Sequence, residues 1–324
     1  MASPFAGRRI LITGGLGFIG SNLAIRLVEE GADVLLVDSM LPAYGATLEN
    51  IEPVAGRLQV NFSDMRDRHS LSYLVRERDL IFSLAGQVSH SESMRDPETD
   101  LAINGTSQLS LLECCRHGNP KAKIIFASTR QIYGRPQYLP VDENHPLAPV
   151  DVNGINNLAA EMYYTLYNQV YGMPTVSLRL TNTYGPRMDL ASRTKGFVGI
   201  FIDLALSGQR IQLFGDGSQR RDFNYVDDVV EALLLAAARD ELNGQVFNLG
   251  HGTPYSLLEF VEVLHRLTGV SYDCVPFPED VKAIDIGDYF GSYSRFSKAT
   301  GWEPRIDLEE GLRRTLEHHR GRRK

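Results

Sequence analysis

The stretch Thr-Gly-Gly-Leu-Gly-Phe-Ile-Gly at residues 13–20 decides the fold of this chain. It directly follows a β-branched apolar run at 9–13 and opens a segment whose apolar residues recur at helical spacing. Gly14 permits a tight turn, Gly17 lets a pyrophosphate approach the backbone, and Gly20 lets the helix pack against the sheet. The first turn of that helix then offers amide donors and partial positive charge to the phosphates. The pattern therefore predicts a dinucleotide site on a strand–turn–helix unit.

An acidic residue at the end of the next apolar run narrows the choice of cofactor. Asp38 follows the run at 33–37 and lies 18 residues after Gly20, where a carboxylate accepts hydrogen bonds from the adenosine ribose. Neither Ser39 nor Met40 carries the positive charge that a 2′-phosphate needs. The sequence therefore favours NAD over NADP. The alternative is a purely structural glycine turn followed by a surface aspartate.

Short apolar runs alternate with longer helical patterns along the first two-thirds of the chain, and the rhythm changes after Pro186. Such alternation predicts a parallel sheet with helices on both faces. We therefore expect an α/β fold, a Rossmann-type doubly wound parallel sheet with a smaller, mixed α/β C-terminal lobe. The expected NAD-binding domain is 1–186, and 187–324 is mainly the substrate lobe, with an interleaved boundary because some segments return to the main sheet. Strands are expected at 9–13, 33–37, 58–61, 80–84, 124–128, 175–179, 211–214 and 245–249, and helices at 18–30, 68–75, 99–117, 153–171, 197–207, 226–238, 256–268 and 308–319.

The composition argues against several classes of partner. The 324 residues carry a formal net charge of −7, so no basic surface favours nucleic acid. No apolar run is long enough to predict a membrane-spanning helix, and the N-terminus lacks the apolar core of a signal peptide. Cys114, Cys115 and Cys274 have no spacing typical of a zinc site or a disulfide framework. We expect a cytoplasmic protein with no metal, membrane or nucleic-acid partner.

The spacing G-x-x-G-x-x-G, together with later segments, resembles the extended short-chain dehydrogenase/reductase family. Asp64 and Met65 are similar to the family's contact with the adenine, and Leu-Ala-Gly-Gln at 84–87 is similar to its loop beside the adenosine ribose. Asn104 resembles the helix asparagine that supports the active-site backbone. By this resemblance, the cofactor-binding residues are Gly14, Gly17, Phe18, Ile19, Gly20, Asp38, Ser39, Asp64, Met65, Leu84, Ala85, Gly86, Asn104 and Asn157.

Further stretches resemble the nucleotide-sugar epimerase and dehydratase branch of that family, which includes UDP-glucose 4-epimerase. The segment R-L-T-N-T-Y-G-P places Asn182 at the substrate diphosphate, and G-D-G-S-Q-R-R-D-F places Arg221 as a phosphate clamp, a task that suits the planar guanidinium. An ion pair of Arg221 with Asp222 or Asp227 is the alternative. The resemblance thus implies a nucleotide-activated sugar as substrate, with Thr129, Asn182, Lys195, Phe197 and Arg221 as its binding residues.

Two further details lie in the C-terminal half, and the first departs from the pattern of the branch. The branch usually reads R-x-G-D where this chain has Asp285-Ile-Gly-Asp288, so the arginine that would hold the nucleotide end is an aspartate. This departure weakens an assignment to UDP in particular. Asp227 and Asp228 are expected to cap the following helix rather than to contact a ligand.

The proton-transferring pair of the family is missing. Its members use a Tyr with a Lys four residues later, whose charge lowers the pKa of the phenol, and a Ser or Thr at the preceding strand end. Thr129 matches that strand end, but alignment of the segment L-A-A-E places Asn153 at the Tyr and Asn157 at the Lys. An amide cannot exchange a proton at neutral pH. The resemblance therefore implies Thr129, Asn153 and Asn157 as the catalytic positions of an atypical active site.

Other ionisable side chains lie in or near the matched segments: Asp151, His145, His90 and Arg130, with Tyr163 and Tyr164 further along the helix. Each of them alone is better explained as a structural or surface group, and the two tyrosines are expected to point away. Arg130 and Gln131 also replace the acidic pair that a 4,6-dehydratase needs. The leading hypothesis is an NAD-dependent sugar 4-epimerase that works through a keto intermediate. The alternatives are a catalytically impaired protein that binds NAD and a nucleotide sugar, a dehydratase, or another oxidoreductase with a different acid–base group.

The resemblance also implies a homodimer. In the family, the helices that match 99–117 and 153–171 pair across a two-fold axis as a four-helix bundle. The apolar face for this pairing would come from Met162, Tyr163, Leu166, Tyr167 and Val170. The same residues could equally belong to the core of the monomer.

Overall fold

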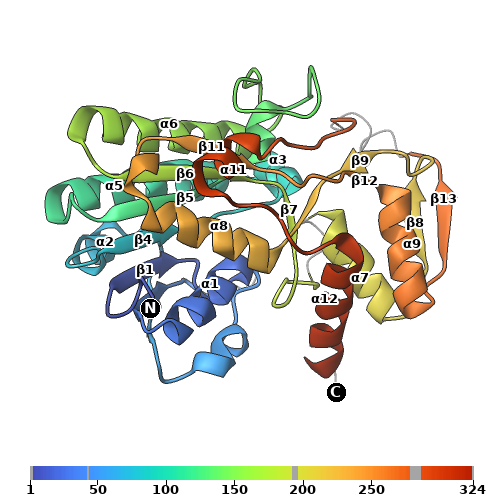
Figure 1. The fold of residues 1–324 in the computed structure, drawn as a ribbon, viewed down its shortest axis with the longest axis horizontal. Coiled ribbons are helices and arrows are strands. Elements are labelled where there is room, and N and C mark those ends of the chain that lie inside the picture. Colours follow the sequence, from blue (N-terminus) through green and yellow to red (C-terminus); the bar gives the residue numbers. More distant parts are fainter. Residues whose placement is uncertain (1–2, 42–43, 192–195, 278–285, 323–324) are drawn as a thin grey trace.

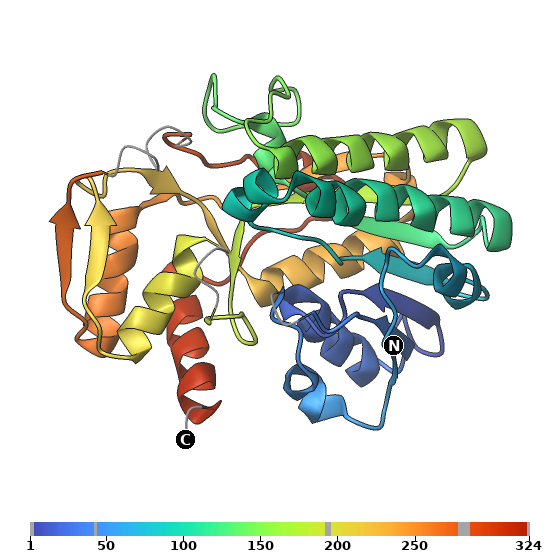
Figure 2. The same ribbon diagram turned by 180° about the vertical axis from the view of Figure 1, so that it is seen from behind.

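The computed structural model describes residues 3–41, 44–191, 196–277 and 286–322, which form two lobes (Figures 1 and 2). The larger lobe contains a seven-stranded sheet of order β11-β6-β5-β4-β1-β2-β3, in which all neighbouring strands are parallel. The strands are β1 (Arg9–Thr13), β2 (Asp33–Val37), β3 (Gln59–Asn61), β4 (Leu80–Ser83), β5 (Lys123–Thr129), β6 (Thr175–Leu180) and β11 (Val246–Leu249). The strand order reverses between β1 and β4, which opens a crevice at their carboxyl ends. The predicted doubly wound, Rossmann-type sheet is confirmed.

Helices cover both faces of this sheet because successive side chains of a buried strand point to opposite sides. In β1, Ile10 and Ile12 join the core under α1 (Phe18–Glu29) and α8 (Val226–Ala238), whereas Leu11 joins the core of the other face. That other face carries α2 (Arg68–Leu74), α5 (Ser107–Gly118) and α6 (Val152–Tyr171). Figure 2 shows α5 and α6 side by side over the sheet. The strands are nearly continuous apolar runs because both of their faces are covered.

The smaller lobe has an apolar core of its own. The rings of Phe201 and Phe223 pack against Phe260, with centroids 6.4 and 4.8 Å away. Its helices are α7 (Phe197–Leu206), α9 (Leu257–Thr268) and α12 (Leu308–Arg322). Its strand pairs are β8 (Ile211–Phe214) with β13 (Tyr272–Val275), β7 (Asn182–Tyr184) with β10 (Phe223–Tyr225), and β9 (Arg220–Arg221) with β12 (Tyr255–Ser256). The short pairs β7/β10 and β9/β12 link this lobe to the main sheet (Figure 1).

The chain passes between the lobes more than once. β11 pairs with β6 at the edge of the main sheet, α8 packs on α1 and β5, and α11 (Ser294–Thr300) packs on β11. Part of the segment 187–324 thus belongs with the larger lobe, as the expected interleaving implies. The division after residue 186 itself stays a prediction.

The helix expected at 99–117 is present, but it contains a π-helical turn near its start. α4 (Pro97–Asp100) leads into a π-helical turn, η3 (Leu101–Thr106), and α5 begins only at Ser107. Asn104 in this turn is buried and is bonded twice to the backbone of Gln87, accepting from its N–H (3.0 Å) and donating to its carbonyl (2.9 Å). Such turns place a side chain outside the ordinary helical register and are frequent at functional sites. The apolar spacing of the sequence does not show the interruption.

The other predicted helices and strands lie within about three residues of the observed ones. Short elements that the sequence did not predict include α3 (His90–Arg95), the 3-10 turns η2 (Leu48–Val54), η4 (Arg130–Tyr133) and η5 (Asp240–Leu242), the helix α11, and the strands β7, β9, β10, β12 and β13. Within the described ranges, no helix is both long and apolar enough to cross a lipid bilayer.

The expected cap of α8 is wrong. The helix follows Tyr225, and no side chain caps its first turn. Asp228 is instead buried, and its carboxylate accepts a hydrogen bond from the backbone N–H of Ile306 (3.1 Å). This carboxylate therefore joins α8 to the segment that leads into α12, because an acceptor buried at that depth needs a donor.

The expected apolar face of α6 is only partly exposed. Tyr167 is buried and donates its hydroxyl to Glu113 (2.6 Å), so it belongs to the monomer core. Tyr164 is also buried, stacks on Phe126 at 4.6 Å and donates to Gln108 (2.9 Å), so it too belongs to the monomer core. The exposed apolar residues of the face are Met162, Leu166 and Val170.

Candidate active site

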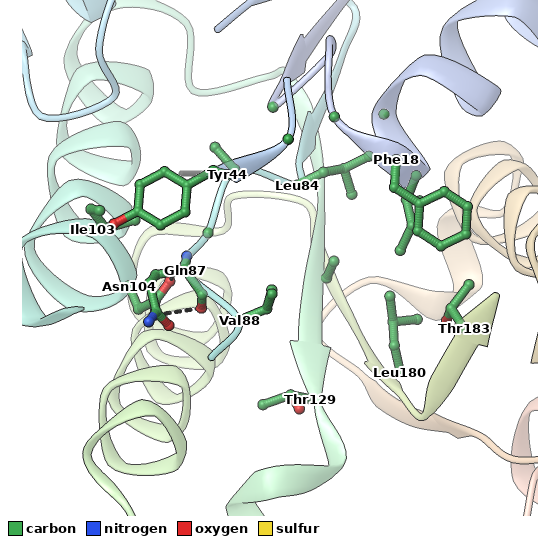
Figure 3. A pocket seen from close by; sticks show the side chains of 18 of the residues that line it. Phe18, Tyr44, Leu84, Gln87, Val88, Ile103, Asn104, Thr129, Leu180 and Thr183 are labelled. Atoms are coloured by element: carbon green, nitrogen blue, oxygen red, sulfur yellow. Dashed lines mark hydrogen bonds between the residues drawn. The ribbon is translucent and has the colours of Figure 1, made fainter. Parts of the chain in front are cut away.

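One pocket of about 520 Å³ lies at the carboxyl ends of β1, β2, β4 and β5 and continues to the smaller lobe. Figure 3 shows Tyr44 and Ile103 on one side of it, Leu180 and Thr183 on the other, and Thr129 at the end of its strand. Lys195 and Asp285 lie outside the described residues. The remaining predicted site residues all line this pocket: Gly14, Gly17, Phe18, Ile19, Gly20, Asp38, Ser39, Asp64, Met65, Leu84, Ala85, Gly86, Asn104, Thr129, Asn153, Asn157, Asn182, Phe197 and Arg221.

The glycine turn can adopt its close backbone packing only because side chains are absent. Gly14 has a φ of +67°, and a Cβ atom there would lie 2.9 Å from the backbone of Ala85. A Cβ atom on Gly20 would lie 2.2 Å from the carbonyl oxygen of Gly14. Gly17 is the N-cap of α1, so no side chain caps the first-turn amides. An uncapped helix start on a turn of this kind fits a pyrophosphate.

The carboxylate of Asp38 is fixed beside this turn. Its two oxygens accept hydrogen bonds from the backbone N–H groups of Leu16 (3.0 Å) and Met40 (2.9 Å). Burial raises the pKa of Asp38, and the two backbone hydrogen bonds oppose that rise. Each carboxylate oxygen has a second lone pair, so the group can also accept from a ribose hydroxyl. The residues around the turn therefore fit the adenosine half of NAD.

The far end of this half-site contains one residue that sequence reasoning missed. Tyr44, from the loop after β2, lies beside Ile103 in Figure 3, and burial raises its pKa. No periodicity or motif marks a loop residue of this kind, so only the structure reveals it. Nearby, Arg66 donates two hydrogen bonds to the Asp64 carboxylate (2.7 and 3.0 Å) and holds the pKa of that group below its usual value.

Two of the predicted substrate residues, Asn182 and Arg221, lie on the strands that link the two lobes. Asn182 on β7 donates its side-chain amide to the carbonyl of Asp222 (2.9 Å). Arg221 on β9 is buried, and its guanidinium donates to the carbonyl of Gly287 (2.6 Å). The Asp222 carboxylate accepts instead from the backbone N–H of Gly291 (2.9 Å). Backbone carbonyls thus hold the guanidinium at the pocket wall, and its planar fork suits an anionic ligand.

The two asparagines that replace the expected dyad form one hydrogen-bonded unit at the start of α6. Asn153 is buried, and its amide donates to the carbonyl of Gln87 (2.7 Å), to the side chain of Gln87 (3.0 Å) and to Asp100 (3.0 Å). Asn157 donates to the backbone carbonyl (2.9 Å) and the side-chain oxygen (3.2 Å) of Asn153. The donors of Asn153 are therefore engaged in joining three segments of the chain.

Thr129 ends β5 at the pocket, and its hydroxyl accepts from the backbone N–H of Gln131 (3.2 Å). That hydroxyl keeps its own proton to donate. Arg130, the next residue, also lines the pocket and places its guanidinium 4.9 Å from the ring centroid of Tyr289. The strand end therefore presents a hydroxyl and a cation, and neither is a base at neutral pH.

Two histidines were considered as acid–base groups, and the structure separates them. His145 is buried with both nitrogens engaged, Nε2 accepting from Gln137 N–H (2.8 Å) and Nδ1 donating to the Pro146 carbonyl (2.8 Å). His90 lines the pocket, and its Nδ1 is hydrogen-bonded to the carboxylate of Asp151. In the sequence His90 and Asp151 are separate candidates, and the fold brings these two side chains together.

Comparison with known proteins identifies the family. A family model described as GDP-mannose 4,6 dehydratase matches residues 11–315. The chain belongs to the nucleotide-sugar epimerase and dehydratase family of extended short-chain dehydrogenases. This membership confirms the resemblance seen in the sequence, and it accounts for the doubly wound sheet and the second lobe.

Members of this family with similar sequences catalyse different reactions. UDP-glucose 4-epimerase of Mycolicibacterium smegmatis is 30% identical over 318 residues, which cover 97% of this chain and 99% of the relative. UDP-N-acetyl-alpha-D-glucosaminuronate decarboxylase of Bacillus cytotoxicus is 30% identical over 321 residues, covering 97% and 98%. UDP-glucose 4-epimerase of Thermus thermophilus, solved in complex with NAD, has a TM-score of 0.86 and 32% identity, covering 97% of this chain and 99% of that chain. That complex supports the prediction of NAD as the cofactor.

Proposed function

We propose that this chain is an NAD-dependent nucleotide-sugar 4-epimerase with an atypical acid–base group. The observation that carries the proposal is the continuity of one pocket, which includes the glycine turn and Asp38 as well as Asn182 and Arg221. Thr129 lines the same pocket, so a dinucleotide and a sugar nucleotide would share one space. The NAD bound in the Thermus thermophilus relative and the activities of the related enzymes support the proposal.

The chemistry divides between cofactor and chain. When bound, NAD supplies a hydride acceptor and donor for the sugar C4. Arg221 would bind the diphosphate with its guanidinium fork, and the Thr129 hydroxyl would hydrogen-bond the C4 oxygen. A side chain must also take the proton of that hydroxyl and later return it. Since the hydride returns to the opposite face of the sugar, no cofactor is consumed.

Two other activities fit the pocket less well. Elimination of water needs an acidic pair next to Thr129, and this chain has Arg130 and Gln131 there, both lining the pocket. A non-catalytic binding protein is favoured by Asn153 and Asn157, because their amides do not exchange protons. Against it stands the complete set of predicted binding residues in the same pocket.

The test is to incubate the protein and NAD separately with UDP-glucose, UDP-galactose, UDP-N-acetylglucosamine, UDP-glucuronate, dTDP-glucose and GDP-mannose. Products are followed by proton NMR and mass spectrometry, and NADH by its absorbance. A C4 epimer of unchanged mass, without net NADH, is expected for at least one substrate. Loss of water or carbon dioxide would replace the epimerase assignment with a dehydratase or a decarboxylase. Binding of these sugars without conversion would favour the non-catalytic alternative.

A matched pair of variants tests the placement of the substrate. Arg221→Gln is expected to raise the KM for the sugar nucleotide at least tenfold, with NAD affinity changed less than threefold, because the residue is proposed to hold the diphosphate. Arg210→Gln is the control, since Arg210 pairs with Asp273 on the exposed surface of the smaller lobe (2.6 Å). An equal loss of NAD affinity in Arg221→Gln would contradict its placement at the substrate.

The homodimer stays a proposal that rests on one exposed stripe. Met162, Leu166 and Val170 are exposed along α6 at helical spacing, next to α5. Pairing of α5 and α6 with a second copy would bury this stripe. Light scattering after gel filtration should give twice the chain mass of 36.1 kDa, and Leu166→Lys should give the monomer. A monomeric wild-type protein at micromolar concentration would contradict the proposal.

A further inference from the structure

The proposed epimerase lacks an assigned proton carrier, and one pair of residues has the geometry for that task. His90 begins α3, directly after the loop that lines the pocket, and 42% of its side chain is exposed. Its partner Asp151 is the N-cap of α6, two residues before Asn153. The pair therefore reaches the pocket at the same helix start where the family carries its tyrosine.

Asp151 is held so that it orients the imidazole. Its side chain is 9% exposed, and one carboxylate oxygen accepts from the backbone N–H of Gly154 (2.7 Å) while the other faces His90 Nδ1. Burial raises the pKa of Asp151, but the hydrogen bond with His90 and neighbouring positive charge outweigh it, so the group stays below its ordinary pKa. An ionised Asp151 accepts a hydrogen bond from the Nδ1–H group of His90, and in that tautomer of the neutral ring Nε2 carries the free lone pair.

The Nε2 atom of His90 is available to a ligand. In the part of the chain that the structure describes, only the Asp151 contact engages this imidazole. The charged groups on the elements packed around it are of both signs and include Asp151 before α6, Glu92 and Arg95 on α3, Glu98 and Asp100 on α4, and Arg130 on η4. A half-exposed imidazole with a fixed tautomer and a free nitrogen in a ligand pocket is the arrangement of a general base.

Four other ionisable groups near the end of β5 do not meet these conditions. Both nitrogens of His145 are engaged, and the Tyr133 hydroxyl donates to Asn248 (2.7 Å), with a pKa raised by burial to about 12. Arg130 is a permanent cation. The Asp222 carboxylate is fully buried behind Arg221 and has no exposed oxygen. His90 alone among these groups combines access with a free lone pair.

We propose that His90 is the catalytic acid–base of this chain and that Asp151 is its positioning residue. The inference rests on the proposed epimerase function. As the C4–H bond breaks and its hydride is transferred to the cofactor, Nε2 of His90 takes the proton of the C4 hydroxyl, and the C4–O bond becomes a carbonyl. When the hydride returns to the other face, the same nitrogen gives its proton back to the oxygen. Protons and electrons therefore balance over one turnover.

The test compares His90→Gln, Asp151→Asn and the control His117→Gln, an exposed histidine 3.5 Å from Glu113 at the end of α5. His90→Gln should lower kcat by about 10²–10⁴-fold, the usual contribution of a general acid–base group, with KM and NAD affinity within threefold. Asp151→Asn keeps the helix cap but removes the charge, so it should lower kcat less and shift the acid limb of the kcat–pH profile. The control should stay within twofold of wild type.

Two further readouts separate catalysis from structure. The acid limb of the wild-type profile should be absent from the residual rate of His90→Gln, and added imidazole should raise the rate of His90→Ala at least fivefold but not that of His117→Ala. Turnover by wild type with unchanged kcat in His90→Gln would overturn this inference alone. Absence of any turnover by wild type would overturn both the inference and the proposed function.

Discussion

The side-chain amide of Asn153 donates a hydrogen bond to the carboxylate of Asp100 (3.0 Å), and both groups are buried. The same carboxylate also accepts from Asn104 (3.1 Å) and Asn156 (2.8 Å). Three neutral amides therefore surround one buried carboxyl group in the part of the chain that the structure describes. The network joins α4, η3 and α6 behind the pocket, at the position where relatives of the family carry a tyrosine.

Replacement of Asn153 should consequently affect stability as well as activity. Asn153→Ala leaves buried acceptors on Gln87 and Asp100 with fewer donors and should lower the free energy of unfolding by about 1–3 kcal/mol. Asn153→Asp places a second carboxylate against that of Asp100 and should lower the free energy of unfolding more than Asn153→Ala does at pH 7. The difference between the two variants should shrink as the pH falls and carboxylates take up protons. Urea unfolding at pH 5 and 7 measures both effects. Asn157→Ala is the control, because among the described residues its amide donates only to Asn153; an equal loss in all three variants would contradict the network.

A second prediction concerns the glycine turn. Gly20→Ala would push a methyl group to 2.2 Å from the Gly14 carbonyl oxygen, so the turn or the helix must shift at the phosphate site. We expect NAD affinity to fall at least tenfold, which corresponds to about 1.4 kcal/mol. Calorimetric titration with NAD measures this. Gly118→Ala is the matched control, since its added Cβ atom meets nothing nearer than 3.8 Å. A similar NAD affinity in the two variants would show that the close approach is not needed for binding.

The sheet and most helices could be predicted because their signals are local. The strands around Ile10 and Ile124 are apolar runs that must be covered on both faces, and the glycine turn requires a strand before it and a helix after it. The π-helical turn at Leu101–Thr106 could not be predicted, because the apolar spacing continues through it. The position of Asn104 in the turn is fixed by its hydrogen bond to the Gln87 carbonyl. Such a bond depends on where another segment lies.

The candidate site divides in the same way. The cofactor residues from Gly14 to Asp38 lie on consecutive elements and follow from spacing alone. The pairing of His90 with Asp151 joins residues 61 positions apart, so no local pattern predicts it. Tyr44 lies in a loop without periodicity, so its place at the pocket follows from the path of the chain. Contacts between distant segments are therefore what the sequence left open.

The preference for NAD can be tested by replacing the negative charge at the end of β2 with a positive one. Asp38→Ala with Ser39→Arg removes the carboxylate and supplies a cation for a 2′-phosphate. The ratio of the Kd for NADP to that for NAD should fall at least tenfold, measured by calorimetry. Ser39→Arg alone should change the ratio less, because the fixed carboxylate of Asp38 still repels the phosphate. An unchanged ratio in the double variant would place the adenosine ribose elsewhere.

Asp222 should make the folded protein less stable as the pH rises, the opposite of the usual effect of a carboxyl group. The residue is fully buried, and one of its carboxylate oxygens has no hydrogen-bond partner in the described chain. Burial raises its pKa from 3.8 to about 6, against the opposing effects of the Gly291 N–H and the Arg130 charge. The folded state therefore holds this proton at pH values where the unfolded chain has released it. Ionisation of Asp222 therefore lowers the free energy of unfolding. This loss of stability is small below pH 3.8, grows as the pH rises, and is complete above about pH 6.

Asp222→Asn should remove this penalty, because an amide does not ionise. With about 1.4 kcal/mol for each pKa unit, the stability of wild type relative to the variant should fall by roughly 2.4 kcal/mol between pH 4 and 7. The variant keeps an oxygen for the Gly291 N–H but brings an amide without an acceptor, so its absolute stability can lie on either side of wild type. The slope of the difference with pH is thus the readout, taken from urea unfolding at four pH values, and titration of all other groups cancels in it. A difference that stays constant from pH 4 to 7 would mean that Asp222 titrates in the folded protein as it does in the unfolded chain.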